Sequence, residues 1–141
     1  MDNVRYIYNY ENLKAEKGEP IREMMVKRND PNWVVIYDDI TVVYDYHKLS
    51  EDRYFMWAQI NSDTYMFGNK KIAVGMSRER IEKILRNSKR PIIPEDKMRL
   101  YDAEGELQYR IVEKYYNDNY DFGLGFVYDE NDCVEYIYWL K

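Results

Sequence analysis

Few residues in this chain are of the types that do chemistry at neutral pH. His47 is the single histidine, and it stands between Asp45 and Lys48 at the predicted end of a strand. A zinc site takes three or four ligands, and a serine–histidine pair needs a third group to orient its base. We therefore interpret His47 as a surface residue. We expect no metal site, no catalytic triad and no cofactor.

The single cysteine, Cys133, excludes an intrachain disulfide and a thiolate metal site. It lies in a run where apolar residues alternate, so we expect an inert side chain in the core.

Carboxylates are plentiful, with 26 Asp and Glu, so some lie near each other by chance. The densest clusters are Asp38–Asp39 and Asp129–Asp132. Neither fits the calcium-loop pattern; in the second cluster Cys133 follows Asp129 and Asn131, and Val134 stands where the pattern requires glycine. Both clusters are typical of turns. An acid pair for glycoside hydrolysis stays open, since such pairs are distant in sequence, but nothing singles one out.

Gly123-Leu124-Gly125 is the one G-x-G in the chain, and no phosphate-binding pattern follows it. These glycines indicate a strand on which a neighbouring backbone or ring packs closely.

Tyrosine is the unusual component, with 16 in the chain. Tyr115, Tyr116 and Tyr120 share a polar stretch with Asp118 and Asp121. Tyrosine joins a large apolar ring to a hydroxyl and is enriched in binding interfaces. We expect this stretch to be exposed between strands and to bind a partner. The alternative is that the rings cover a sheet edge or fill a core.

The net charge is -5 and the isoelectric point about 5.0. A basic surface is what non-specific nucleic-acid binding requires, so this composition argues against it. An acidic face speeds encounter with a basic protein, although the same charge also simply keeps a domain soluble. Asp129, Glu130 and Asp132 form a second candidate contact surface for such a partner.

The 141 residues fit one domain, 1–141, with 45% hydrophobic residues. No stretch approaches the roughly 20 apolar residues of a membrane span, and the N-terminus does not resemble a signal peptide. We expect a cytoplasmic protein; an exported protein with its signal removed is the alternative.

The pattern predicts an α+β fold with an antiparallel sheet. Alternation predicts an N-terminal strand from Val4 to Tyr10, and Pro20 followed by apolar residues at helical spacing predicts a short helix over 20–28. Further strands are expected over 33–46, broken by a hairpin turn at Asp38–Asp39, and over 54–60, 107–111, 120–128 and 133–140.

The clearest helix signal covers about 77–87. Ser77 is a good N-cap, and Met76 and Ile81 occupy the positions of a hydrophobic staple. An apolar stripe at i, i+3 and i+4 faces the core. Its members are Ile81, Ile84 and Leu85.

The run KIAVGMSRERIEKIL at 71–85 resembles the helix start of outer-membrane-assembly lipoprotein (SmpA/OmlA-like) modules and of the related β-lactamase-inhibitor-protein-like folds. GLGFVY at 123–128, a turn, and VEYI at 134–137 extend the resemblance over 70–140. The family often has G-x-P after its helix, and 86–91 lacks that glycine. There is no lipid-accepting cysteine near the N-terminus, and 1–60 has no counterpart. The resemblance implies a non-enzymatic module that binds proteins.

Three hypotheses follow. The first is an inhibitor or immunity-type protein, not an enzyme, that masks a basic protein partner such as a toxin. The second is a structural or assembly module of a bacterial cell-envelope protein. The third is an enzyme whose carboxylates the sequence does not place.

Overall fold

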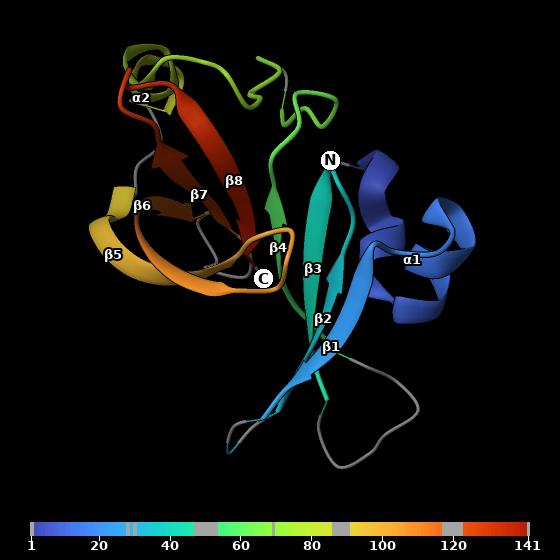
Figure 1. Cartoon of the computed structure of the whole chain (residues 1–141). Coiled ribbons are helices and arrows are strands. Elements are labelled where there is room, and N and C mark those ends of the chain that lie inside the picture. The colour runs from blue at the N-terminus through green and yellow to red at the C-terminus, as the bar shows by residue number, and fades with distance from the viewer. Residues whose placement is uncertain are drawn as a thin grey trace.

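The computed structural model describes residues 2–27, 29, 31–46, 54–68, 70–85, 91–116 and 123–140. Its strands form one antiparallel sheet of eight, in the order β1-β2-β3-β4-β8-β7-β6-β5, which curls into a half-barrel (Figure 1). The strands are β1 (Arg22–Val26), β2 (Asn32–Ile36), β3 (Ile40–Asp45), β4 (Tyr54–Ile60), β5 (Pro91–Tyr101), β6 (Leu107–Tyr116), β7 (Gly123–Tyr128) and β8 (Val134–Leu140). The fold is therefore α+β with the sheet dominant.

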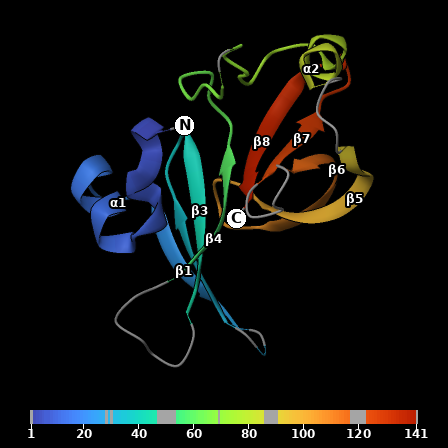
Figure 2. The same ribbon diagram turned by 180° about the vertical axis from the view of Figure 1, so that it is seen from behind.

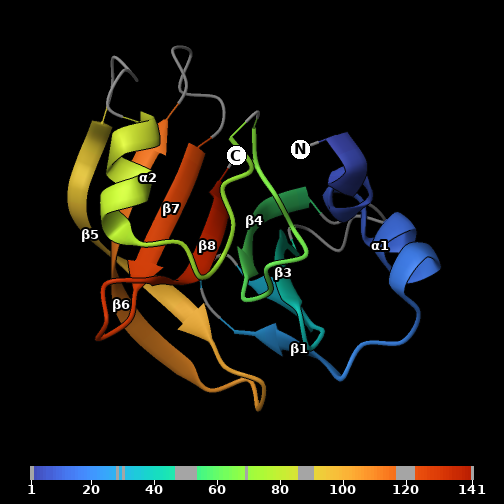
Figure 3. The same cartoon turned by 90° about the horizontal axis from the view of Figure 1, so that it is seen from above.

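Helices lie near both ends of the sheet order. A 3₁₀ helix η1 (Asp2–Tyr8) leads into α1 (Tyr10–Lys17), which lies beside β1, β2 and β3 (Figures 1 and 2). The second α-helix, α2 (Arg78–Leu85), lies beside β7 (Figure 3). Asn9 caps α1 by accepting the Asn12 N–H at 3.1 Å, and Gly18 ends it with φ of 79°.

The predicted N-terminal strand is wrong, because residues 2–8 form η1. The alternation placed Tyr6 and Tyr8 on one face and Ile7 on the other. Ile7 is the fully buried residue, and its carbonyl accepts the Tyr44 hydroxyl at 2.5 Å. Packing of Ile7 against β3 thus outweighed the period-two pattern of the tyrosines.

The helix predicted over 20–28 is also wrong. Residues 22–26 form the edge strand β1, with Met24 opposite Val34 and Met25 opposite Trp33. Methionine is a good helix former, but tertiary context overrides intrinsic propensity here, through the ladder of backbone hydrogen bonds to β2. Ile21, expected on the helix's apolar face, is 60% exposed.

The helix predicted from Ser77 is confirmed over 78–85. The Ser77 hydroxyl accepts the Arg80 N–H at 3.2 Å, as an N-cap does. Ile81 is fully buried, whereas Ile84 and Leu85 are half-buried against the same core. Residues 86 and 87 lie outside the described part of the chain.

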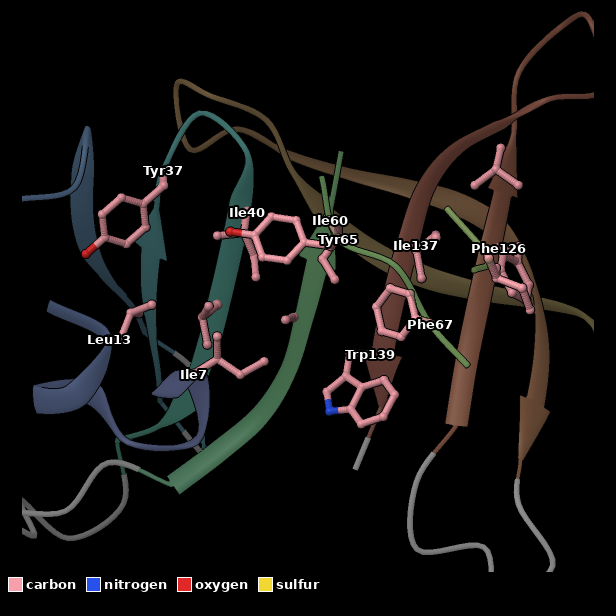
Figure 4. Packing of buried hydrophobic residues seen from close by; sticks show 14 of the residues in the cluster. Ile7, Leu13, Tyr37, Ile40, Ile60, Tyr65, Phe67, Phe126, Ile137 and Trp139 are labelled. Carbon is pink, nitrogen blue, oxygen red and sulfur yellow. The ribbon is translucent and has the colours of Figure 1, made fainter. Parts of the chain in front are cut away.

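The sheet buries apolar side chains on both faces. One face packs against η1, α1 and the segment before α2 (Figure 4), and also against Ile81 of α2. Its largest contributors include Ile7, Leu13, Tyr44, Phe67, Ile81, Phe126 and Trp139. The other face closes on itself as the sheet curls. A Cβ built on Gly105, in the β5–β6 turn, would lie 2.8 Å from Sδ of Met24 on β1, so the ends of the sheet meet.

The predicted hairpin turns are confirmed. Asp38 and Asp39 join β2 to β3, and residues 129–132 join β7 to β8. Gly125 allows the close approach expected of it: a Cβ there would lie 2.7 Å from Cγ1 of Val112. The expectation for Cys133 is wrong, because its side chain is only half-buried, at the edge of the turn.

Candidate protein-binding surface

Arg78, the first residue of α2, gathers acidic side chains from three elements. Its guanidinium forms ion pairs with Glu113 on β6 and with Asp132 in the β7–β8 turn, the latter at 3.3 Å. The third partner is Glu82, one turn further along α2, at 3.8 Å. The Arg78 N–H also donates to the Asp132 carbonyl at 2.7 Å. Arg78 therefore ties the helix to the sheet and to the turn.

Two tyrosines complete this group. The Arg78 guanidinium lies 4.4 Å from the centre of the Tyr128 ring, a cation–π contact. The Tyr115 hydroxyl donates to Oε2 of Glu113 at 3.2 Å. Burial, and then the charge of Glu113, raises the pKa of Tyr115 to about 12, so its hydroxyl stays a donor at neutral pH. These six residues form the Arg78 cluster: Arg78, Glu82, Glu113, Tyr115, Tyr128 and Asp132.

The Arg78 cluster holds three carboxylates and one guanidinium, a local excess of negative charge. Burial lowers the pKa of Arg78, but the charge and hydrogen bond of Glu113, together with the charge of Asp132, outweigh that effect and keep the pKa above its ordinary value. Glu113 is mostly buried, whereas the side chains of Glu82 and Asp132 are 52% and 66% exposed. The carboxylate of Glu113 thus holds Arg78 from the buried side, and those of Glu82 and Asp132 face solvent.

Of the residues expected to bind a partner, two meet in this cluster. Asp132 contacts Arg78 directly, and Tyr115 reaches it through Glu113. Tyr115 is not exposed between strands as expected. It belongs to β6 and is half-buried, with its ring edge-on to Phe126 at 5.8 Å.

The other expected residues divide into two groups. Asp129 is occupied in shaping its turn, because its Oδ1 accepts the N–H groups of Asn131 and Cys133 at 2.9 and 3.0 Å. Glu130 is exposed at the tip of that turn. Tyr116 ends β6, and its side chain lies outside the described part. So do Asp118, Tyr120 and Asp121, and also His47.

The sequence reasoning missed Arg78, Glu82, Glu113 and Tyr128. Arg78 and Glu82 are spaced i, i+4 on a helix that was expected, and this spacing alone signals an ion pair. Glu113 and Tyr115 are two apart on a strand, which places both on one face. The link between the two elements comes from tertiary packing, and the sequence carried no local signal for it.

Two other acidic side chains, Glu23 and Asp39, hold elements of the fold together. Glu23 on β1 accepts from Tyr10, Lys14 and Trp33, and Asp39 accepts from Lys17 and Tyr65. Among residues the structure describes, no three acids, histidines or cysteines cluster closely enough to hold a metal ion. A cavity bounded by Tyr37, Gln59 and Tyr101, among others, has a volume of about 40 Å³, which suits water rather than a metabolite.

The comparisons with known proteins give a likeness of fold. No family model matches the sequence, and no curated protein matches it. The fold is similar to that of a cysteine-rich secretory protein from Staphylococcus aureus subsp. aureus Mu50, with a TM-score of 0.53 and 11% sequence identity. The alignment covers 94% of this chain and 42% of that one, so this chain spans about two fifths of its length. At this identity the likeness concerns the fold alone.

The comparisons do not bear on the resemblance of 70–140 to lipoprotein modules, which stays a prediction. Within the described residues, no helix is both long and apolar enough to cross a membrane.

Proposed function

We propose that this protein is a non-enzymatic inhibitor or immunity-type domain that masks a basic protein partner, such as a toxin. Its contact surface consists of the Arg78 cluster and the adjoining β7–β8 turn. The supporting observation is the arrangement of charge: three carboxylates surround one guanidinium, and Glu82 and Asp132 present theirs to solvent.

In this proposal Arg78 holds the acidic side chains of the surface in place. It neutralises one of three charges and fixes the positions of the other two, so little side-chain freedom is lost on binding. Lysine or arginine side chains of the partner would pair with Glu82, Asp132 and the exposed Glu130. The half-buried rings of Tyr115 and Tyr128 then supply the apolar base of the contact.

Affinity capture from the source organism tests this proposal with matched baits. The test bait carries Glu82→Gln and Asp132→Asn, which remove the two exposed charges and leave the Arg78–Glu113 pair. The control bait carries Glu16→Gln and Glu19→Gln, which remove the same charge from exposed positions on and after α1.

We expect the wild-type and control baits to retain a basic protein that the test bait loses. Equal capture by all three baits would contradict the proposed surface. Capture of cell-envelope components by all three would favour the assembly-module hypothesis instead.

A further inference from the structure

A row of large apolar side chains lies exposed on β6. Leu107, Tyr109 and Ile111 are 41%, 60% and 62% exposed and, at alternate positions of one strand, share a face. The row is distinct from the Arg78 cluster, which β6 reaches only at Glu113 and Tyr115. Apolar side chains exposed side by side on a strand mark a surface that binds protein. These three residues form the β6 stripe.

The backbone beside the β6 stripe is an open sheet edge. Within the described residues, β7 pairs with β6 only over 113–116, whereas β5 pairs along 107–112 on the other side. Residues 107–112 are therefore paired on one side, whereas Lys114 and Tyr115 are paired on both.

The register shows which backbone groups face that open edge. The Asp102 N–H donates to the Glu106 carbonyl at 3.1 Å, so the next pair, Tyr101 with Leu107, is of the non-hydrogen-bonded kind. The N–H and C=O groups of both residues in this pair therefore point away from the partner strand. Consistently, both outward groups of Tyr101 bond to Gln59.

The alternation continues along the hairpin. Arg99 faces Tyr109, and Lys97 faces Ile111. The N–H and C=O groups of Leu107, Tyr109 and Ile111 all point toward the open edge. The β6 stripe thus combines exposed apolar side chains with six outward backbone hydrogen-bonding groups.

We propose that a second copy of this chain docks on this edge, with β6 pairing antiparallel to β6 about a two-fold axis at Tyr109. In that register Tyr109 faces its own counterpart, and Leu107 of one copy faces Ile111 of the other. All six outward groups form hydrogen bonds, and every cross-strand pair within the stripe is apolar. The occupant is inferred from this self-complementarity, which an isologous interface requires.

The charges fit the same register. On the other face, Arg110 of one copy stands opposite Gln108 of the second, so no like charges are opposed. Arg110 is already paired with Glu135 of its own chain at 2.8 Å. Five paired residues a side make a small interface, which gives a weak, concentration-dependent dimer. The net charge of -5 on each copy opposes association, so added salt strengthens it.

Sedimentation across a concentration series tests the dimer. Wild-type protein is expected to shift from monomer to dimer, and further so with added salt. Tyr109→Lys opposes two like charges at the axis and should abolish the shift. Met66→Lys, at an apolar position that is 49% exposed elsewhere, is the control and should leave the shift unchanged.

A charge swap tests the register. Leu107→Glu and Ile111→Lys alone should each weaken association. An equimolar mixture of the two should associate again, because the antiparallel register sets the new lysine opposite the new glutamate. All the substituted side chains are exposed, and thermal melts verify that each variant folds.

A wild-type chain that stays monomeric at every concentration would overturn the proposal, and so would a dimer that Tyr109→Lys leaves intact. A dimer that the mixture fails to restore would overturn the register. If the wild-type chain is monomeric and the β6-stripe variants no longer retain a protein that the wild type captures, the β6 stripe binds that protein and not a second copy of the chain.

Discussion

The side-chain amide of Gln59 takes the place of a neighbouring strand for Tyr101. Its Nε2 donates to the Tyr101 carbonyl at 2.6 Å, and its Oε1 accepts the Tyr101 N–H at 3.0 Å. Gln59 points from β4 into the curl of the sheet, and Tyr101 is on the outer edge of β5. The next outward carbonyl, that of Arg99, accepts the Tyr138 hydroxyl at 2.8 Å. Side chains of β4 and β8 thus cover the β5 edge and hold the half-barrel curled.

Gln59→Ala is expected to destabilise the fold, because it leaves the buried N–H and C=O groups of Tyr101 without their hydrogen-bond partners. Each unsatisfied group costs about 1–3 kcal/mol, so the total for the two groups is about 2–6 kcal/mol. Urea unfolding measures the change, with Gln108→Ala at an exposed position of β6 as the control. If the two variants unfold at the same urea concentration, the edge of β5 is not held by Gln59.

Gly125→Ala is expected to lower the free energy of unfolding by about 1–3 kcal/mol through overpacking. The added Cβ would lie 2.7 Å from Cγ1 of Val112 and 3.3 Å from Cβ of Tyr138. Val112→Ala opens space for it, so the double variant should lose less stability than the two single losses added together. Strict additivity in chemical unfolding would show that the β6 and β7 strands do not press together there.

Substitutions in and beside α2 should lower the free energy of unfolding by different amounts, according to how deeply each side chain is buried. Ile81→Ala should cost about 2–5 kcal/mol because the side chain is fully buried, and half-buried Leu85→Ala should cost less. Ser77→Ala removes the N-cap and should cost about 1 kcal/mol. Denaturant melts of the three variants give the order. A Leu85→Ala loss as large as that of Ile81→Ala would contradict the observed packing.

Acid should weaken the attachment of α1 to the sheet through Glu23. Burial alone raises the pKa of Glu23, but hydrogen bonds from Tyr10, Lys14 and Trp33 outweigh it and hold the pKa below its ordinary 4.5. A lowered folded-state pKa gives stability that is present above the unfolded value and lost as pH falls through the folded one. Glu23→Gln should therefore be destabilised at neutral pH and approach the wild type in strong acid. Exposed Glu16→Gln should track the wild type throughout.

The sequence predicted best where the signal was local. The N-cap at Ser77, the turn at Asp129 and the close approach at Gly125 each follow from chemistry within a few residues, and each is confirmed. The strand over 4–10 and the helix over 20–28 were wrong because the structure of the described residues there depends on distant partners. Ile7 packs on β3, and Met24 gains its ladder from β2.

The candidate surface was predicted in part for the same reason. Asp132 and Tyr115 were singled out from composition, as acids and tyrosines beside turns. Arg78, which brings them together, comes from a helix 54 residues before Asp132 in the chain. Neither local propensity nor periodicity encodes such a contact.

The most direct measurement of the proposed function is the association rate of the captured basic partner as ionic strength varies. Charge outside an interface core mainly sets the encounter rate. Glu82→Gln with Asp132→Asn should slow association by roughly tenfold at low salt and flatten its salt dependence. The Glu16→Gln, Glu19→Gln control should behave as the wild type. Equal association rates for all three proteins would contradict the proposal that the Arg78 cluster receives a basic partner.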